Sequence, residues 1–240
     1  MPNDDGSVDP GLAAALRAHD VEPARLPQVL AALHRARVLA PIVALLQETG
    51  TSPVGLRVEK TSNIALPLLL DADGRKAVLV FSSLDTLHRW DRSARPVPVT
   101  GPRAADVALG EGAEGIVLDV AGPSPVTLGL PEVRALAGGR GAVPAYDDDE
   151  LAGEVSRLLA HEPDVLGGWV APGAGVDAVL TVVLDSVRVG VALEDAGARL
   201  AQVLRAPALR GAAVRGLDLV VQSGLAPEPA GLRVFHRGLF

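Results

Sequence analysis

Short runs of leucine, valine, isoleucine and alanine, separated by stretches that contain glycine and proline, limit how this chain can fold. Aromatic residues make up only 2% of the 240 residues, so the core must be built from aliphatic side chains. Apolar residues account for 48% and charged residues for 21%, close to the average of soluble globular proteins. A compact chain of this length buries about 70–75% of its unfolded surface without needing a disulfide or a metal. We therefore expect an ordered α/β protein of the α+β type.

The first half of the chain alternates between helical and strand-like patterns. Residues 1–10 are polar and predict a disordered tail. Two apolar runs, 64–70 and 76–81, flank a turn that contains Asp and Gly, which predicts a β-hairpin. Ser82 together with Asp85 predicts the cap of the helix that follows. The other elements expected here are helices at 11–19, 26–33, 84–90, 102–111 and 131–137, strands at 38–46, 115–120 and 126–130, a loop at 47–57, and an extended segment at 95–99 that its alternating prolines exclude from a helix.

Glycines and prolines at 138–144 give the strongest linker signal of the chain, and a second set of elements follows it. Segment 187–193 alternates strictly and is predicted to form a hairpin with 178–184 across Asp185-Ser186. The other elements expected here are helices at 147–159 and 195–205 and strands at 165–170, 217–221 and 232–236. Because helix, hairpin and helix recur in the same order on both sides of the linker, we expect two mixed-sheet modules.

Composition excludes several classes of function. The chain has no cysteine, which rules out disulfides, thiolate metal sites and cysteine nucleophiles. A net charge of −7 argues against binding to nucleic acid, whose partners usually have a basic face. The acidic start lacks the features of a signal peptide, and the most apolar region, 178–193, contains Asp185 and Arg188. We expect a cytoplasmic protein with no nucleic-acid or membrane partner.

Three motifs resemble ligand sites but favour structural interpretations. Residues 110–115 match the dinucleotide pattern G-x-G-x-x-G, but the helix precedes the motif and the strand follows it, which predicts a helix C-cap and a turn. Residues 71–74 resemble the start of a calcium loop without its downstream Glu, which predicts the hairpin turn instead. The acidic run 147–150 fits the first turn of a helix, whose dipole favours negative charge. We predict no metal and no cofactor.

No catalytic motif is present either. The chain contains no G-x-S-x-G elbow and no phosphate-binding P-loop. Its histidines lack metal-ligand spacing and favour structural roles: they are His19, His34, His88, His161 and His236. A Ser/His/Asp triad assembled from distant positions stays open, so the question of an enzyme is undecided and leans towards a negative answer.

Three residues are candidates for binding a ligand or a partner. Lys60, one of only two lysines, precedes an apolar run and can present an amine to an anion, or it is an ordinary exposed lysine. Trp90 and Arg95 flank the end of a helix beside a proline-rich segment, and both residue types are common at interface hot spots. The alternative for this pair is a Trp that covers the core and an ion pair between Asp91 and Arg95. Trp169 is expected in the core.

Several stretches of the sequence together resemble the SseB family, named for enhanced serine sensitivity. These stretches are Ala36–Val43, Lys60–Pro67, Asp73–Arg75, Val78–Ser83, Trp90-Asp91, Ala94–Pro98, Glu111–Ala113, Ile116–Asp119 and Gly122-Pro123. The resemblance implies an SseB N-terminal-like domain at 21–138, preceded by the tail and short helix at 1–20. Residues 146–240 resemble the C-terminal domain of the family through the order of elements and the ending Arg233–Arg237. Asn63 departs from the Asp that related sequences often carry.

The resemblance implies an intracellular bacterial protein of poorly defined function, often labelled as secretion-related. A translocon component of type III secretion has the same name, but it has long helices and membrane-inserting segments that this chain lacks. Our leading hypothesis is a non-enzymatic binding or adaptor protein for a protein or small-molecule ligand. The alternatives are an enzyme or small-molecule-binding regulator in serine-linked amino-acid metabolism, and a structural homodimer.

Overall fold

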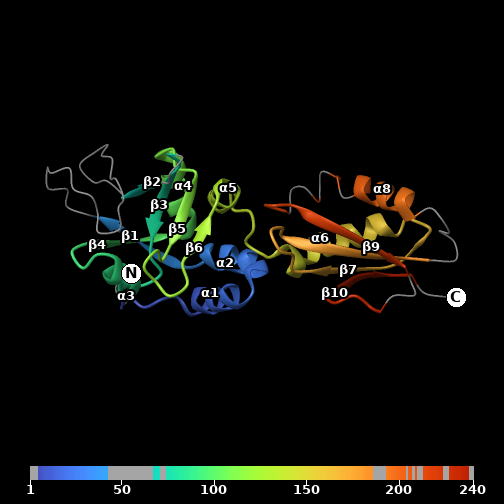
Figure 1. The fold of residues 1–240 in the computed structure, drawn as a ribbon, viewed down its shortest axis with the longest axis horizontal. Coiled ribbons are helices and arrows are strands. Elements are labelled where there is room, and N and C mark those ends of the chain that lie inside the picture. Colours follow the sequence, from blue (N-terminus) through green and yellow to red (C-terminus); the bar gives the residue numbers. More distant parts are fainter. Residues whose placement is uncertain are drawn as a thin grey trace. The chain divides into compact units, whose positions relative to one another are not determined.

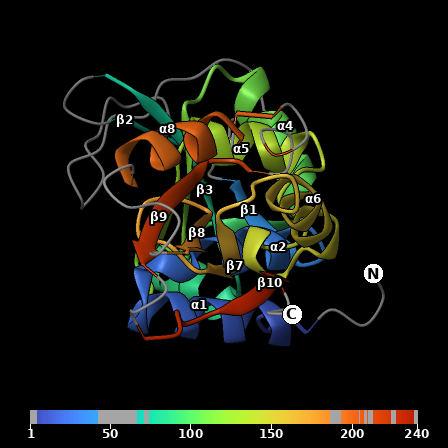
Figure 2. The ribbon, with the colours of Figure 1, turned by 90° about the vertical axis from the view of Figure 1, so that its right-hand side faces the viewer.

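The computed structural model describes residues 5–42, 67–70, 74–185, 193–203, 205–206, 209, 213–223 and 227–237 (Figures 1 and 2). The chain divides into two compact units. Unit 1 comprises Met1–Glu22 and Gln28–Ala142, and unit 2 comprises Pro23–Pro27 and Val143–Phe240. Each unit contains a four-stranded mixed sheet accompanied by helices, which confirms the predicted α+β class.

The elements that precede Gly138 form one two-stranded and one four-stranded sheet with their helices. The helices are α1 (Pro10–Val21), α2 (Leu26–Leu33), α3 (Leu84–Trp90), α4 (Gly101–Gly110) and α5 (Leu130–Ala137), with a short 3-10 turn at Pro23–Arg25. The strands are β1 (Arg37–Ile42), β2 (Leu68–Leu70), β3 (Lys76–Val80), β4 (Arg95–Thr100), β5 (Gly115–Leu118) and β6 (Val126–Leu128). The large sheet has the order β2-β3-β5-β6, with β3 and β5 parallel and both outer pairs antiparallel.

Most of the elements predicted for this part are confirmed within a few residues. The antiparallel pairing of β2 with β3 is the predicted hairpin, although residues 71–73 of its turn lie outside the described residues. The predicted loop at 47–57 and the end of the strand predicted at 38–46 also fall outside them. After α4, Gly112 adopts φ 68° and the Ala113 N–H binds the carbonyl of Ala108 at 2.9 Å. The G-x-G-x-x-G stretch is therefore a helix C-cap and turn, as predicted.

Local caps decide where two of the helices begin. The Asp9 carboxylate accepts the Leu12 N–H at 3.0 Å and Pro10 occupies the first turn of α1, where its missing N–H is not needed. Helix α3 begins with a capping box in which Ser83 and Thr86 satisfy each other's backbone N–H groups. The prediction that Ser82 and Asp85 form this cap is therefore wrong by one residue. The side chain of Ser82 is held elsewhere.

Strand β4 pairs with β1 in an antiparallel register that places Pro98 opposite Leu39 and Pro96 opposite Pro41. The extended conformation predicted for this proline-rich segment is confirmed. Proline has no N–H to offer to a further strand, and prolines within sheets are confined to edges. Pro96 and Pro98 thus make β4 a poor template for pairing with another chain.

Unit 2 places two helices over a second mixed sheet. Its elements are a 3-10 turn (Ala145–Asp147), α6 (Asp149–Leu159), β7 (Val165–Ala171), β8 (Ala178–Leu184), α8 (Leu193–Val203), β9 (Leu217–Ser223) and β10 (Leu232–His236). The strand order is β10-β7-β8-β9, and only β8 and β9 are parallel. The core joins Leu151, Val155 and Leu159 of α6 and Leu200 of α8 to alternate residues of the sheet such as Leu180 and Val182.

The sequence predictions for unit 2 are confirmed for most elements. Asp148 caps α6 by accepting the N–H groups of Glu150 at 2.9 Å and Leu151 at 3.1 Å, so the acidic run is the start of a helix. The predicted hairpin partner of β8 at 187–193 falls outside the described residues except for Leu193, which begins α8. The strands that pair with β8 are β7 and β9.

Candidate functional site

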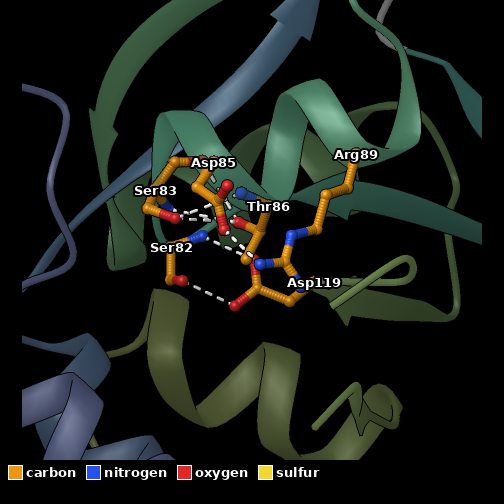
Figure 3. A network of polar contacts seen from close by, with 6 residues as sticks. All are labelled: Ser82, Ser83, Asp85, Thr86, Arg89 and Asp119. Atoms are coloured by element: carbon orange, nitrogen blue, oxygen red, sulfur yellow. Dashed lines mark hydrogen bonds and ion pairs between the residues drawn. The ribbon is translucent and has the colours of Figure 1, made fainter. Parts of the chain in front are cut away.

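The carboxyl ends of the parallel strands β3 and β5 hold a buried Ser–Asp pair (Figure 3). Phe81 and Ser82 directly follow β3, and Asp119 directly follows β5. One oxygen of the Asp119 carboxylate accepts the Ser82 N–H at 2.8 Å, and the other accepts the Ser82 hydroxyl at 2.6 Å. Both residues are only 3% exposed. We call this pair the Ser82–Asp119 clamp, because it ties the ends of two strands that lie 37 residues apart in sequence.

The backbone at Asp119 is shaped for this contact. Asp119 has φ 56°, a left-handed conformation that among non-glycine residues Asn and Asp adopt most readily. Its N–H donates to the carbonyl of Val80 at 3.0 Å, and its carbonyl accepts the N–H of Gly122 at 2.7 Å. A Cβ atom at Gly122 would lie 2.9 Å from the Cβ atom of Asp119. The tight turn after β5 therefore requires glycine at position 122.

The clamp lacks the parts of a hydrolytic site. A serine nucleophile needs a base that removes its proton and an exposed position from which it attacks. Here the hydroxyl is buried and already donates to Asp119. Among the described histidines, His34 and His161 bind the carbonyl oxygens of Arg140 and Arg157, each at 2.8 Å, and none is hydrogen-bonded to the clamp. The contact is one that holds the fold together.

Trp90, one of the predicted binding residues, lies partly buried at the end of α3. Its ring centroid is 5.4 Å from that of Phe81, with the two planes at 32°. It packs against a cluster of buried residues that includes Leu39, Leu79 and Leu87. The structure thus shows Trp90 covering this part of the core while keeping part of its ring accessible, and its role in binding stays a prediction.

Arg95, the second predicted binding residue, begins β4 and is exposed. The ion pair suggested between Asp91 and Arg95 is replaced by a local contact, because the Asp91 carboxylate accepts the N–H and the hydroxyl of Ser93 at 2.8 and 2.7 Å. The third candidate, Lys60, lies outside the described residues.

The structure adds residues in and just after α3 that were not predicted from the sequence as binding residues. A hollow of about 540 Å³ is lined by Asp85, His88, Arg89 and Arg92 on the outer side of α3. Arg89 forms an ion pair with Asp85 at 2.9 Å (Figure 3). We use the name α3–β4 surface for the exposed residues His88, Arg89, Arg92, Arg95 and Val97. Arg89 and Arg92 are spaced as on one face of a helix. Because arginine is common throughout the chain, this spacing did not stand out in the sequence.

A second hollow, of about 590 Å³, lies over one face of the four-stranded sheet of unit 1. Leu69, Ala77, Val117 and Thr127 come from its four strands and share this face of the sheet, and Lys76 and Glu114 also line the hollow. Its volume lies within the range of small-molecule sites. Lys76 and Glu114 line the hollow at the end of β3 and β5 that lies opposite the Ser82–Asp119 clamp.

Two further properties concern the described residues alone. No three His, Asp or Glu side chains among them come close enough together to hold a metal ion. None of the helices described here combines the length and the apolar character needed to cross a membrane.

Comparison with known proteins supports the resemblance seen in the sequence. The family model described as the SseB protein N-terminal domain matches residues 12–135, just over half of the chain. The matched region contains the Ser82–Asp119 clamp, the α3–β4 surface and the sheet-face hollow. No curated protein and no solved structure matches the chain.

Proposed function

The chain belongs to the SseB family, and from that premise we propose that it is a non-enzymatic adaptor protein of the cytoplasm whose α3–β4 surface binds an acidic segment of a partner protein. The observation that carries this proposal is the gathering of exposed arginines beside a partly buried Trp in a chain of net charge −7. Arginine and tryptophan are the residue types most enriched among interface hot spots.

The charges of this surface favour an anionic partner. Asp85 is paired with Arg89, and the Asp91 carboxylate is taken up by Ser93. Within the described part of the chain, Arg92 and Arg95 have neither an ion pair nor a hydrogen bond through their side chains. Their guanidinium groups are therefore free to form bidentate contacts with carboxylates of a partner.

The surface rests on a rigid base. The Ser82–Asp119 clamp and the capping box of Ser83 and Thr86 fix the start of α3, and the contact between Trp90 and Phe81 fixes its end. A binding surface that is ordered before its partner arrives loses less conformational entropy on binding. This rigidity supports recognition by a preformed surface.

The test is a charge reversal with a matched control. Arg92→Glu with Arg95→Glu should reduce the amount of partner captured from a lysate of the source cells about tenfold or more, because both arginines would then repel an acidic segment. Arg103→Glu with Arg134→Glu changes the charge by the same amount at exposed positions of α4 and α5 of the same unit and should leave the capture unchanged. Trp90→Ala should weaken capture as well, with a thermal melt to show that the chain remains folded.

Quantitative mass spectrometry of the captured proteins decides the outcome. Raising the salt concentration from about 0.1 M to about 0.5 M should release the same proteins that the Arg92 and Arg95 variant fails to capture, since screening shortens the reach of surface charges. Identical capture profiles for the wild type, the test variant and the control variant would reject the α3–β4 surface as the binding site.

A small-molecule-binding regulator is the second candidate, and the sheet-face hollow of about 590 Å³ favours it. Thr127 lies on the floor of this hollow and is exposed, so Thr127→Trp should fill it without disturbing the buried core. A thermal-shift screen of amino acids and related metabolites, including serine, should then show stabilisation of the wild type and none of the variant. The third hypothesis, a homodimer, predicts a dimer mass in light scattering at micromolar concentration.

A further inference from the structure

The face of the second sheet that points away from α6 and α8 carries Trp169. Residues of β7 and β8 that alternate with the core, such as Thr181 and Val183, share this face with Trp169. The indole ring of Trp169 lies across Gly167, where a Cβ atom would come within 2.5 Å of the ring. Trp169 is only 7% exposed although it lies on the side of the sheet away from α6 and α8. Something other than the helices must therefore cover it.

Side chains of β10 and of the segment before it surround the Trp169 ring. The guanidinium carbon of Arg233, on the neighbouring strand β10, lies 5.3 Å from the centre of the Trp169 ring. The same guanidinium forms an ion pair with Glu228. A hollow of about 240 Å³ is lined by these residues and by His236, which is also on β10.

Three groups act on the Glu228 carboxylate. The pKa of Glu228 is lowered from its ordinary value, first by the hydrogen bond from Arg233 and then by the charge of Arg233. A hydrogen bond from Trp169, whose only donor is its indole N–H, and the charge of His236 lower it further. Trp169, Arg233 and His236 thus converge on a single carboxylate from two strands.

The segment that supplies this carboxylate has the form of a peptide ligand. Pro227 and Pro229 flank Glu228, which favours an extended conformation. The side-chain amide of Gln222, at the end of β9, donates to the backbone carbonyl of Pro227 at 3.1 Å. Residues that line the hollow therefore contact both the acidic side chain of Glu228 and the main chain next to it.

This internal contact is weak enough to be replaced. The side chains of Arg233 and Glu228 are 45% and 59% exposed, and ion pairs at such positions contribute little to stability because water and salt screen them. The donors of the sheet face, by contrast, lie on paired strands whose positions do not depend on Glu228.

We propose that Trp169, Arg233, His236 and Gln222 form a binding site for an extended, proline-flanked acidic segment of another protein, and that Glu228 occupies this site from within the chain until such a segment displaces it. The contact of Gln222 with a main-chain carbonyl identifies the occupant as a peptide and not a free carboxylate. This site lies in unit 2 and does not rest on the function proposed for the α3–β4 surface.

The experiment follows the indole N–H signal of Trp169 by NMR on the full chain. The chain has two tryptophans, so the Trp90→Phe variant assigns the signal. The ligand is the synthetic peptide Ala-Pro-Glu-Pro-Ala, which has the sequence of residues 226–230. Glu228→Gln removes the internal competitor and should tighten binding of the peptide about two- to fivefold, the range that an exposed ion pair allows.

Two controls sharpen this comparison. Glu154→Gln removes another carboxylate of unit 2 that is paired with an arginine, Arg157, and should leave the peptide affinity unchanged. Arg233→Gln in the Glu228→Gln background should abolish the shift of the Trp169 signal, while the remaining spectrum shows that the unit is folded.

The proposal is overturned by any of three results. The first is equal affinity of the wild type and the Glu228→Gln variant for the peptide. The second is equal binding of the peptide in which Gln replaces Glu, which would show that the carboxylate is not recognised. The third is equal displacement by acetate or free glutamate, which would show a site for small carboxylates instead of a peptide site.

Discussion

The large sheets of unit 1 and unit 2 share a three-stranded arrangement but complete it differently. In each, an antiparallel hairpin continues through a crossover into a strand parallel to the second strand of the hairpin: β2-β3 leads to β5, and β7-β8 leads to β9. The fourth strand then joins opposite edges, because β6 pairs with β5 whereas β10 returns to β7. The two sheets therefore share the arrangement of three strands and differ in the side on which the fourth strand is added.

Each parallel pair is also held by one buried aspartate, at opposite ends. Asp119 fastens the carboxyl ends of β3 and β5 by binding Ser82. Asp177 precedes β8 and accepts the N–H groups of Val214, Arg215 and Gly216 just before β9, at 2.6, 2.6 and 3.1 Å. Parallel strands are connected by long crossovers, so a side chain that fixes the ends of both strands compensates for the absent hairpin turn. The comparison teaches that each unit secures its non-local strand with one carboxylate.

The largest effect is expected from Asp119→Ala. The variant leaves the buried Ser82 N–H and hydroxyl without acceptors and places alanine in a left-handed conformation, which together should cost about 3–5 kcal/mol of stability in unit 1. Asp119→Asn should lose less, because Asn tolerates this conformation and keeps one acceptor. Urea unfolding followed by the fluorescence of Trp90, in a Trp169→Phe background, measures both. Equal losses for Ala and Asn would contradict the role assigned to the conformation.

Asp177→Ala should destabilise unit 2 by about 2–4 kcal/mol, since three N–H groups lose a charged acceptor but are partly accessible to water. Unfolding followed by Trp169 in a Trp90→Phe background reports on unit 2. Asp218→Ala removes an exposed aspartate of the adjacent strand β9 and serves as the matched control, with little change expected. An unchanged unfolding midpoint for Asp177→Ala would show that Asp177 does not hold β8 and β9 together as Asp119 holds β3 and β5.

The smallest effect is expected from lowering the pH. It concerns the contact of Glu228 with Arg233 on β10, the strand whose position distinguishes the two sheets. The pKa of Glu228 lies below its ordinary value of 4.5, so its contact with Arg233 is fully present above that value and is lost as the pH falls through the lowered pKa. The indole N–H signal of Trp169 should therefore shift with a midpoint below pH 4.5, and Glu228→Gln should remove this transition. A midpoint at or above 4.5 would show that the carboxylate is not held.

Much of the fold could be predicted because its signals are local. The apolar run of β8, the prolines of β4 and the acidic start of α6 depend on neighbours a few residues away, and all appear where the patterns place them. The cap of α3 was predicted one residue too early, because the choice between two serines depends on a residue far away in sequence. Ser82 and Ser83 are equally good caps in the sequence, and only the contact of Ser82 with Asp119 decides between them.

The candidate sites were predictable only in part. Trp90 and Arg95 attracted notice by residue type, whereas Arg92 gained significance because it lines one hollow with His88 and Arg89 of α3. Nothing in the sequence singled out Asp119 or Asp177 as residues that hold parallel strands together. Glu228 gave no signal beyond its two flanking prolines, because its partners Trp169 and Arg233 meet only when β10 pairs with β7.

The sequence by itself determined that this chain forms two aliphatic α+β modules without cysteine chemistry, since composition and hydrophobic period act over a few residues at a time. The tertiary structure alone decided which aspartates are buried, which serine caps a helix and which arginine lies over Trp169. Those contacts join residues tens of positions apart, and their existence depends on strand order and register, which local patterns do not specify.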